Sequence, residues 1–384
     1  MNDMRVTWRF LLRVVIKTAA LFVLINIIFA VADPVPTLGR VSIYNRLVPG
    51  RERLPYGEDP ASYNLSMNSI EAMIASHAVN RMDTTDYNVW VIGDSSVWGI
   101  LLDNADTLTG QLNAADLNTE GRRVRAYNLA HPILSVTKDL MLLDYARTLA
   151  QPDLIVWLIT LDSMPYRDQL EPPLLRENPV RVRSLIQTYQ LPLHPNSEQL
   201  ADRTFSDYTL VGQRRALADW LRLQLYGVAW ANTAIDQVVR DYTPRANDFE
   251  SDPSWNSYTQ ETEIFPSVLA FEVIQAGHFA ARGVPVLVVN EPIYRADGTN
   301  SDVRYNAWYP RWAYDQWRTI LNDQATAFEW NFIDLWDAIS PNEFTDSPVH
   351  LTPLGSHQLS ALIASAIMDY PKSAVKPLSL DMGI

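Results

Sequence analysis

Two short stretches, far apart in the chain, carry the side chain types that a serine-dependent hydrolysis needs. Ser95 stands in the triplet Gly93-Asp94-Ser95, and His350 follows Asp346 by four residues. A serine hydroxyl becomes a nucleophile when an imidazole takes its proton, and a carboxylate orients that imidazole and stabilises its cation. Each stretch also has a plainer interpretation, as a polar turn or as a histidine near a helix start. The catalytic interpretation therefore requires that the fold bring the two stretches together.

The predicted elements place both stretches at one edge of a sheet. Residues 88–92 are apolar, β-branched and aromatic, which predicts a strand buried on both faces. Gly93 ends that strand and lets the chain turn, so that Ser95 stands at the carboxyl end. His350 lies on a loop between the last predicted strand and the last predicted helix. Open α/β sheets bind their ligands at this carboxyl edge.

The rest of the body alternates between strands and helices, which predicts an α/β fold with a parallel sheet. Further strands are expected at 124–129, 154–160, 284–290 and 332–336, and helices at 66–81, 107–117, 137–150, 266–282 and 354–368.

Residues 164–265 interrupt this alternation. The segment begins as a proline-rich loop and continues as an expected helix at 212–241. We predict an insertion that either caps a cleft or docks a membrane partner. A later segment, 305–317, is dense in tryptophan and tyrosine, which suits either a sugar-stacking surface or a filled core.

Composition excludes several classes of function. The chain has a net charge of −13 and no cysteine. It therefore lacks the basic footprint of a nucleic-acid-binding protein, and thiolate catalysis, disulfides and thiolate metal sites are excluded. No cluster of metal-ligand residues and no glycine-rich phosphate loop is present, so we expect no metal and no nucleotide cofactor.

The N-terminus predicts a membrane segment. Four cations (Arg5, Arg9, Arg13 and Lys17) precede the uncharged residues 18–32, and the apolar span extends back to residue 14 if Lys17 snorkels. Positive charge before the span keeps the N-terminus cytoplasmic and exports the body. We expect a retained signal-anchor. The alternative is a signal peptide cleaved after Ala32.

The two stretches together resemble the SGNH/GDSL hydrolase family over about 89–161 and 284–365. The family's opening Gly-Asp-Ser is matched by Gly93-Asp94-Ser95, and its closing Asp-x-x-His element by the segment around His350. The resemblance implies a flavodoxin-like three-layer α/β/α parallel sheet, here with a long helical and loop insertion and an N-terminal transmembrane helix. It implies Ser95 as nucleophile and His350 as base.

Three features depart from the family pattern. Asp346 precedes His350 by four residues instead of three, with Ser347 in the expected place, and Asp334 or Asp337 are alternatives. The second family block lacks its glycine within 128–135. The third block, Gly-x-Asn in the family, reads Thr160-Leu161-Asp162.

An ionised Asp162 opposes an oxyanion instead of stabilising it, and one lost donor typically costs about 10²–10³ in rate. Either Asp162 is protonated, or Asn128 or Asn290 donates in its place, or turnover is weak.

The leading hypothesis is an extracytoplasmic, membrane-anchored SGNH-like serine esterase or O-acyltransferase acting on an acylated glycan or cell-envelope polymer. The resemblance, and no particular residue, implies this substrate class and a membrane O-acyltransferase as partner. The alternative is a catalytically degenerate binding or assembly module for that partner.

The expected organisation has four parts. They are a cytoplasmic basic tip and anchor at 1–33, a linker and N-terminal arm at 34–80, the SGNH-like domain at 81–370 with its insertion at 164–265, and a tail at 371–384.

Overall fold

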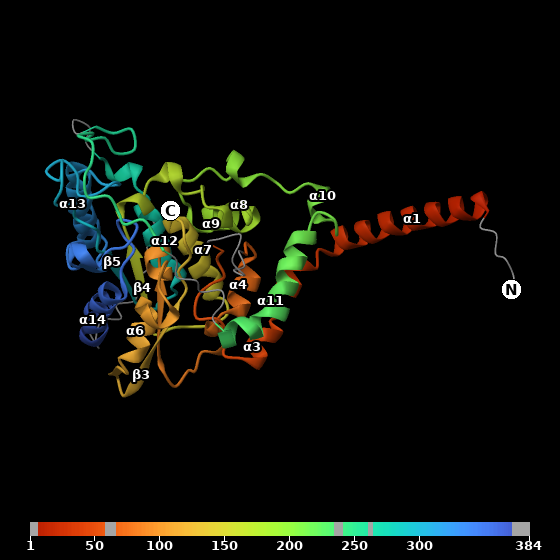
Figure 1. The fold of residues 1–384 in the computed structure, drawn as a ribbon, viewed down its shortest axis with the longest axis horizontal. Coiled ribbons are helices and arrows are strands. Elements are labelled where there is room, and N and C mark those ends of the chain that lie inside the picture. The colour runs from red at the N-terminus through yellow and green to blue at the C-terminus, as the bar shows by residue number, and fades with distance from the viewer. Residues whose placement is uncertain (1–6, 58–66, 234–240, 260–263, 371–384) are drawn as a thin grey trace, which may run out of the picture.

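A single mixed sheet forms the centre of the body. The computed structural model describes residues 7–57, 67–233, 241–259 and 264–370 (Figure 1). Six strands lie in the order β2-β3-β1-β4-β5-β6. Their bounds are β1 Tyr87–Ile92, β2 Asn118–Thr119, β3 Arg122–Asn128, β4 Leu154–Ile159, β5 Val286–Asn290 and β6 Asn331–Asp334.

The pairing confirms the predicted fold class. The short β2 is antiparallel to β3, and all other pairs are parallel. Counted along the chain, the parallel strands take the flavodoxin-like order 2-1-3-4-5, in which the switch point lies between the first and third strands. Here that point lies between β1 and β4, where Val89 pairs with Leu154.

Helices cover both faces of the sheet because the central strands bury both of their faces. Every residue of β1 and β4 is buried, and successive residues alternate between two cores. Trp90 and Ile92 belong to the core beneath α4, α7, α9, α12 and α13, whereas Val89 and Val91 belong to the core beneath α6 and α14. The helices of these layers are α4 Ile70–Ser76, α6 Leu108–Ala114, α7 Val136–Ala146, α9 Pro179–Tyr189, α12 Phe271–Ala280, α13 Arg311–Ala327 and α14 Pro353–Asp369.

The remaining helices are the long N-terminal helix, a few short turns and the helices of the insertion. They are α1 Trp8–Ala32, α2 Val35–Gly39, α3 Ile43–Leu47, α5 Ser95–Trp98, α8 Pro173–Arg176, α10 Phe205–Tyr208 and α11 Arg214–Thr233. Figure 1 shows α1 leaving the body as a separate rod. By length and composition α1 is able to cross a membrane.

Two sequence expectations need correction. The proline-rich start of the insertion contains α8 and α9, which begin at Pro173 and Pro179, where the fixed φ of proline suits the first helical turn. The helix expected at 66–81 starts at residue 70 and breaks at His77, whose Nδ1 accepts from the Val79 N–H. Residue 66 lies outside the described part, as do 234–240 of the helix expected at 212–241.

The structure decides between the two interpretations of the aromatic segment 305–317. Tyr309, Tyr314 and Trp317 are completely buried, and Trp308 and Trp312 pack against the same core. These rings therefore fill the space beneath α13, and most of them are not available to stack on a sugar.

Candidate active site

The turn after β1 presents Ser95 at the switch point of the sheet. Gly93 has φ of 155°, and a Cβ at this position would lie 2.8 Å from the Val97 side chain and 3.1 Å from the Leu158 carbonyl oxygen. Only glycine therefore fits this turn without a shift of its neighbours. The Asp94 carboxylate then caps α5 by accepting from the Ser96 N–H at 2.8 Å. Ser95 becomes the first residue of a short helix, with its side chain partly exposed.

The histidine loop is a tight hairpin before α14. Phe344 and Leu351 form an antiparallel bridge, and the Thr345 N–H donates to the His350 carbonyl at 2.8 Å. Inside the loop, the Ser347 hydroxyl accepts from the N–H groups of Val349 and His350. Ser347 is therefore used to close the backbone turn, which leaves Asp346 to face the imidazole.

Ser95, His350 and Asp346 meet in one chain of hydrogen bonds. The Ser95 Oγ lies 2.9 Å from His350 Nε2, and His350 Nδ1 lies 2.7 Å from Asp346 Oδ1. Because a carboxylate only accepts, Nδ1 carries the proton and Nε2 of the neutral ring accepts from the serine. Burial acts to raise the pKa of Asp346, but the hydrogen bond from His350 and its charge outweigh that effect, so the pKa falls below its ordinary value. The carboxylate is thus ionised, as an orienting acid must be.

The alternative acids have other partners. Both guanidinium contacts of Arg318 reach Asp334, at 2.9 and 2.7 Å, and Asp337 lies 4.0 Å from Arg295. Of the three candidate aspartates, only Asp346 contacts His350 in the described part of the chain.

The three predicted oxyanion or substrate candidates use their polar groups elsewhere. The Asn128 amide donates to the Val97 carbonyl at 2.8 Å, and the Asn290 amide donates to Asp334 at 2.9 Å. The Asp162 carboxylate accepts from the Trp255 indole at 2.9 Å. Burial raises the pKa of Asp162 to about 6, although the Trp255 hydrogen bond lowers it. The structure therefore does not aim any of these side chains at Ser95 as a donor.

The loop after β3 is strained within the segment where the family pattern expects a glycine. Ile133 has φ of 76°, a conformation that is rare for a β-branched residue. This loop lies against the nucleophile turn, because the His131 N–H donates to the Gly93 carbonyl at 3.2 Å. Such strain is concentrated at functional sites.

A buried layer of charged groups beneath Ser95 was not anticipated from sequence. Ser96 donates to the Glu291 carboxyl. Lys138 and Asp139, both fully buried, form an ion pair at 2.7 Å, and the Lys138 ammonium also donates to the Gly93 carbonyl at 2.9 Å. Burial first, and the charge of Asp94 second, raise the pKa of Glu291 well above its ordinary value. The protonated form of Glu291 is therefore favoured more than in an ordinary carboxyl group, and its carboxyl oxygen holds the residue next to the candidate nucleophile.

Sequence signals for this layer exist but are weak. Glu291 directly follows the apolar β5, and Lys138-Asp139 interrupts an otherwise apolar helix. A charge in such a position indicates a buried pair or a site, but the partner lies far along the chain and does not follow from the local pattern.

The other buried histidines are neutral. Burial lowers the pKa of His77 and of His278 to about 4 and that of His131 to about 3. No group of three or more residues suited to hold a metal ion occurs among the described residues.

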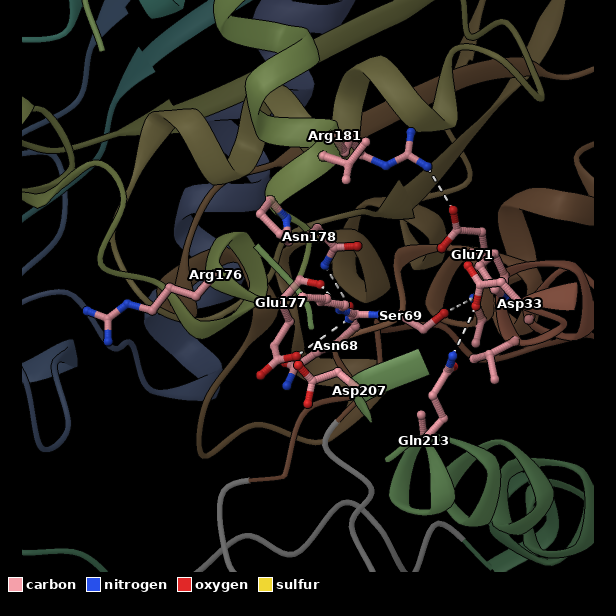
Figure 2. Close-up of a pocket in the computed structure, with 18 of the residues that line it drawn as sticks. Asp33, Asn68, Ser69, Glu71, Arg176, Glu177, Asn178, Arg181, Asp207 and Gln213 are labelled. Atoms are coloured by element: carbon pink, nitrogen blue, oxygen red, sulfur yellow. Dashed lines mark hydrogen bonds and ion pairs between the residues drawn. The ribbon is translucent and has the colours of Figure 1, made fainter. Parts of the chain in front are cut away.

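One cavity lies away from Ser95 and His350. It has a volume of about 1160 Å³ and is lined by residues of α2, α4, α9 and α11, with none of Ser95, His350 and Asp346 among them. Figure 2 shows its polar walls, in which Arg181 pairs with Glu71 at 2.7 Å and Gln213 donates to Asp33 at 3.0 Å.

Fold and site together define the class. The chain has an SGNH hydrolase-like fold, in which a serine on the turn after the first strand meets a histidine from the loop before the last helix.

Comparisons with known proteins find distant likenesses among solved structures. No family model matches the chain, and no curated protein sequence does. Among solved structures, the chain is similar to the M. smegmatis aryl esterase, with 12% identity and a TM-score of 0.33 over 73% of this chain and 97% of that one. It is also similar to a carbohydrate acetylesterase from Sinorhizobium meliloti, with 11% identity and a TM-score of 0.32 over 73% and 98%. Likenesses this distant do not decide a function.

Proposed function

We propose that the protein is a serine-dependent acyl esterase or O-acyltransferase that works outside the cytoplasm. The observation that carries the proposal is the hydrogen-bonded chain from Ser95 through His350 to Asp346, with distances of 2.9 and 2.7 Å. His350 is buried, with only 8% of the residue exposed, so its two hydrogen bonds are shielded from competing water.

The chemistry follows from the donor and acceptor roles. Ser95 Oγ attacks the ester carbonyl carbon while His350 Nε2 takes the hydroxyl proton, and Asp346 stabilises the imidazolium that forms. When the tetrahedral intermediate collapses, the C–O bond of the ester breaks and the leaving alkoxide takes the proton from His350. The acyl group then stays on Ser95 until water or a second alcohol, activated by the same imidazole, removes it.

Backbone groups are the proposed oxyanion donors, because the candidate side chains bond elsewhere. The Ser95 N–H lies in the first turn of α5, where helical N–H groups have no partner within the helix. An N–H from the strained loop around Ile133 is the proposed second donor.

The proposed substrate is an acylated glycan or cell-envelope polymer, and a membrane O-acyltransferase is the proposed partner. The proposed location is the outer side of the cell membrane, with α1 as a retained anchor. Its support is the length and apolar composition of α1, together with Arg9, Arg13 and Lys17 in its first half.

The test is labelling of the full-length protein, in detergent, with a fluorophosphonate probe, followed by peptide mapping and an aryl acetate assay. We expect labelling at residue 95 that is lost in Ser95→Ala and kept in the neighbouring control Ser96→Ala. Folded wild-type protein that takes no label overturns the proposal.

That negative result would favour the binding or assembly module. The specific observation in favour of this second function is that Asn128, Asp162 and Asn290 all bond away from Ser95.

A further inference from the structure

The C-terminal end of α1, next to the body, is bonded to the insertion at two points. Asn26, which is buried although it belongs to the apolar helix, accepts from the Val211 N–H at 3.2 Å. Asp33, just after α1, accepts from the Gln213 amide at 3.0 Å. These bonds, together with the packing of α10 against α1, tie the start of α11 to the anchor.

The attachment at Asn26 lies within the apolar span of α1 and not beyond its end. Asn26 precedes the end of α1 at Ala32 by six residues, or about 9 Å of helix at 1.5 Å per residue. If α1 crosses a bilayer, the neighbouring part of the insertion enters the zone between headgroups and acyl chains. Its exposed side chains there include the apolar Phe205 and Val211, together with the polar Ser206 and Asp207.

From this point α11 continues over the side of the body from which α1 leaves (Figure 1). One face of α11 packs on the N-terminal arm. The Gln224 amide oxygen accepts from the Ile43 N–H at 2.7 Å, the Trp220 indole donates to the Val41 carbonyl at 3.2 Å, and the Tyr44 ring lies directly against Gly227.

The opposite face of α11 is exposed and apolar. Leu221 and Leu225, four residues apart, lie on it between Ala218 and Ala229, and Leu225 is 65% exposed. The neighbouring α3, which packs against α11, also exposes apolar side chains, Ile43 and Leu47, the latter 70% exposed. We call this set the α3–α11 face: Ile43, Leu47, Ala218, Leu221, Leu225 and Ala229.

Charge around the α3–α11 face has the sign that suits lipid headgroups. Arg214, Arg215 and Arg222 are exposed on α11, although the chain as a whole is acidic. The acid between them, Asp219, is paired with Arg215 and Arg222. Apolar side chains flanked by arginines on one helix face are typical of helices that lie in a membrane interface.

We propose that the α3–α11 face rests on the same bilayer that α1 crosses, so that the body is held at two places and not on a free tether. The proposal rests on α1 being retained as the anchor. We assign the lipid interface as the partner of the α3–α11 face because this face continues from the point where α1 is bonded to the body. Transmembrane helices tilt by about 20° on average, which lets a rigidly attached α11 approach the surface.

Because the chain contains no cysteine, single cysteines allow a direct test. Full-length Leu225→Cys carries an environment-sensitive fluorophore in nanodiscs of phosphatidylcholine and phosphatidylglycerol. The control is Leu354→Cys. Leu354 is 55% exposed and belongs to α14, which Figure 1 places on the other side of the body. Quenching by headgroup-level doxyl lipid and by aqueous iodide is measured at both positions.

We expect doxyl lipid to quench the residue 225 label several-fold more strongly than the residue 354 label, with the reverse order for iodide. Equal quenching by lipid at both positions overturns the proposal. A second outcome also overturns it: the residue 225 label is not quenched by lipid, but its protection from iodide increases with protein concentration. That result would identify an interface between copies of the protein.

A label at Val23→Cys, within α1, separates this failure from that of the anchor. Strong lipid quenching at residue 23 without quenching at residue 225 refutes the resting face alone, and quenching at neither refutes the anchor as well. A second measurement uses Leu221→Cys as reporter. Adding Leu225→Asp should abolish its lipid quenching, whereas adding Leu354→Asp should not.

Discussion

Replacing Asp346 by asparagine should slow the chemistry of Ser95 by about 10²–10³. Asparagine keeps the size of the side chain but removes the charge that lies 2.7 Å from His350 Nδ1. Opposite charges about 4 Å apart near a protein surface attract by about 4 kcal/mol, and each 1.4 kcal/mol changes a rate about tenfold. The Asp346 side chain is 33% exposed, so water screens part of this attraction. The expected loss is therefore smaller than the roughly 10⁴-fold loss known for a buried triad aspartate.

The assay is the second-order rate of fluorophosphonate labelling, supported by aryl acetate turnover, for the full-length protein. The matched control is Ser347→Ala, which removes a side chain from the same loop. It should change the rate by at most about thirtyfold, because Ser347 bonds to only two backbone N–H groups and each such bond is worth about 1 kcal/mol. The reasoning is refuted if Asp346→Asn stays within about threefold of wild type. It is also refuted if Asp334→Asn causes the same loss as Asp346→Asn.

Three further substitutions test the surroundings of the site. Glu291→Gln should remove a pH dependence of stability. Because the pKa of Glu291 is raised in the folded protein, its contribution to the free energy of unfolding is complete below about pH 4.5 and is lost as the pH rises through the folded-state pKa. The midpoint of thermal unfolding should therefore fall less between pH 5 and 8 in the variant than in the wild type. Asp162→Asn should act in the same direction over a narrower pH range, since the pKa of Asp162 rises from 3.8 to about 6. In urea titrations between pH 4 and 8, the free energy of unfolding of the wild type should fall by up to about 3 kcal/mol relative to that of the variant. The same pH dependence in both proteins would contradict this. Ile133→Gly should leave stability within about 1 kcal/mol of wild type, because relief of backbone strain at φ 76° offsets the entropy of glycine, whereas the control Leu134→Gly should be clearly destabilising.

Local pattern was sufficient for the centre of this fold. The strands that become β1, β4 and β5 are mostly apolar runs bounded by glycine, proline or polar residues, which is the pattern typical of a strand buried on both faces. The pattern does not predict α8 and α9, because a proline-rich segment is typical of a loop, whereas here proline stands at the first helical position of both helices.

Tertiary contacts decided what the pattern left open. The aromatic residues at 305–317 suited either a surface or a core, and only the packing of α13 places Tyr309, Tyr314 and Trp317 inside. The pairing of Ser96 with Glu291 joins the ends of β1 and β5, which are not neighbours in the sheet. No spacing along the chain predicts such a contact.

The four-residue spacing of Asp346 and His350 has a physical explanation in the hairpin. Bridging of Phe344 to Leu351, with the bond from Thr345 to the His350 carbonyl, places residues 346–349 in the turn. Ser347 closes that turn by accepting two backbone N–H groups, so the extra residue relative to the family spacing is accommodated in the turn and does not displace the imidazole. The carboxylate at position 346 consequently reaches Nδ1. A variant that deletes Ser347 should restore the family spacing but lose the two turn bonds, and we expect it to label more slowly than Ser347→Ala, because the hairpin and not the count of residues sets the position of His350.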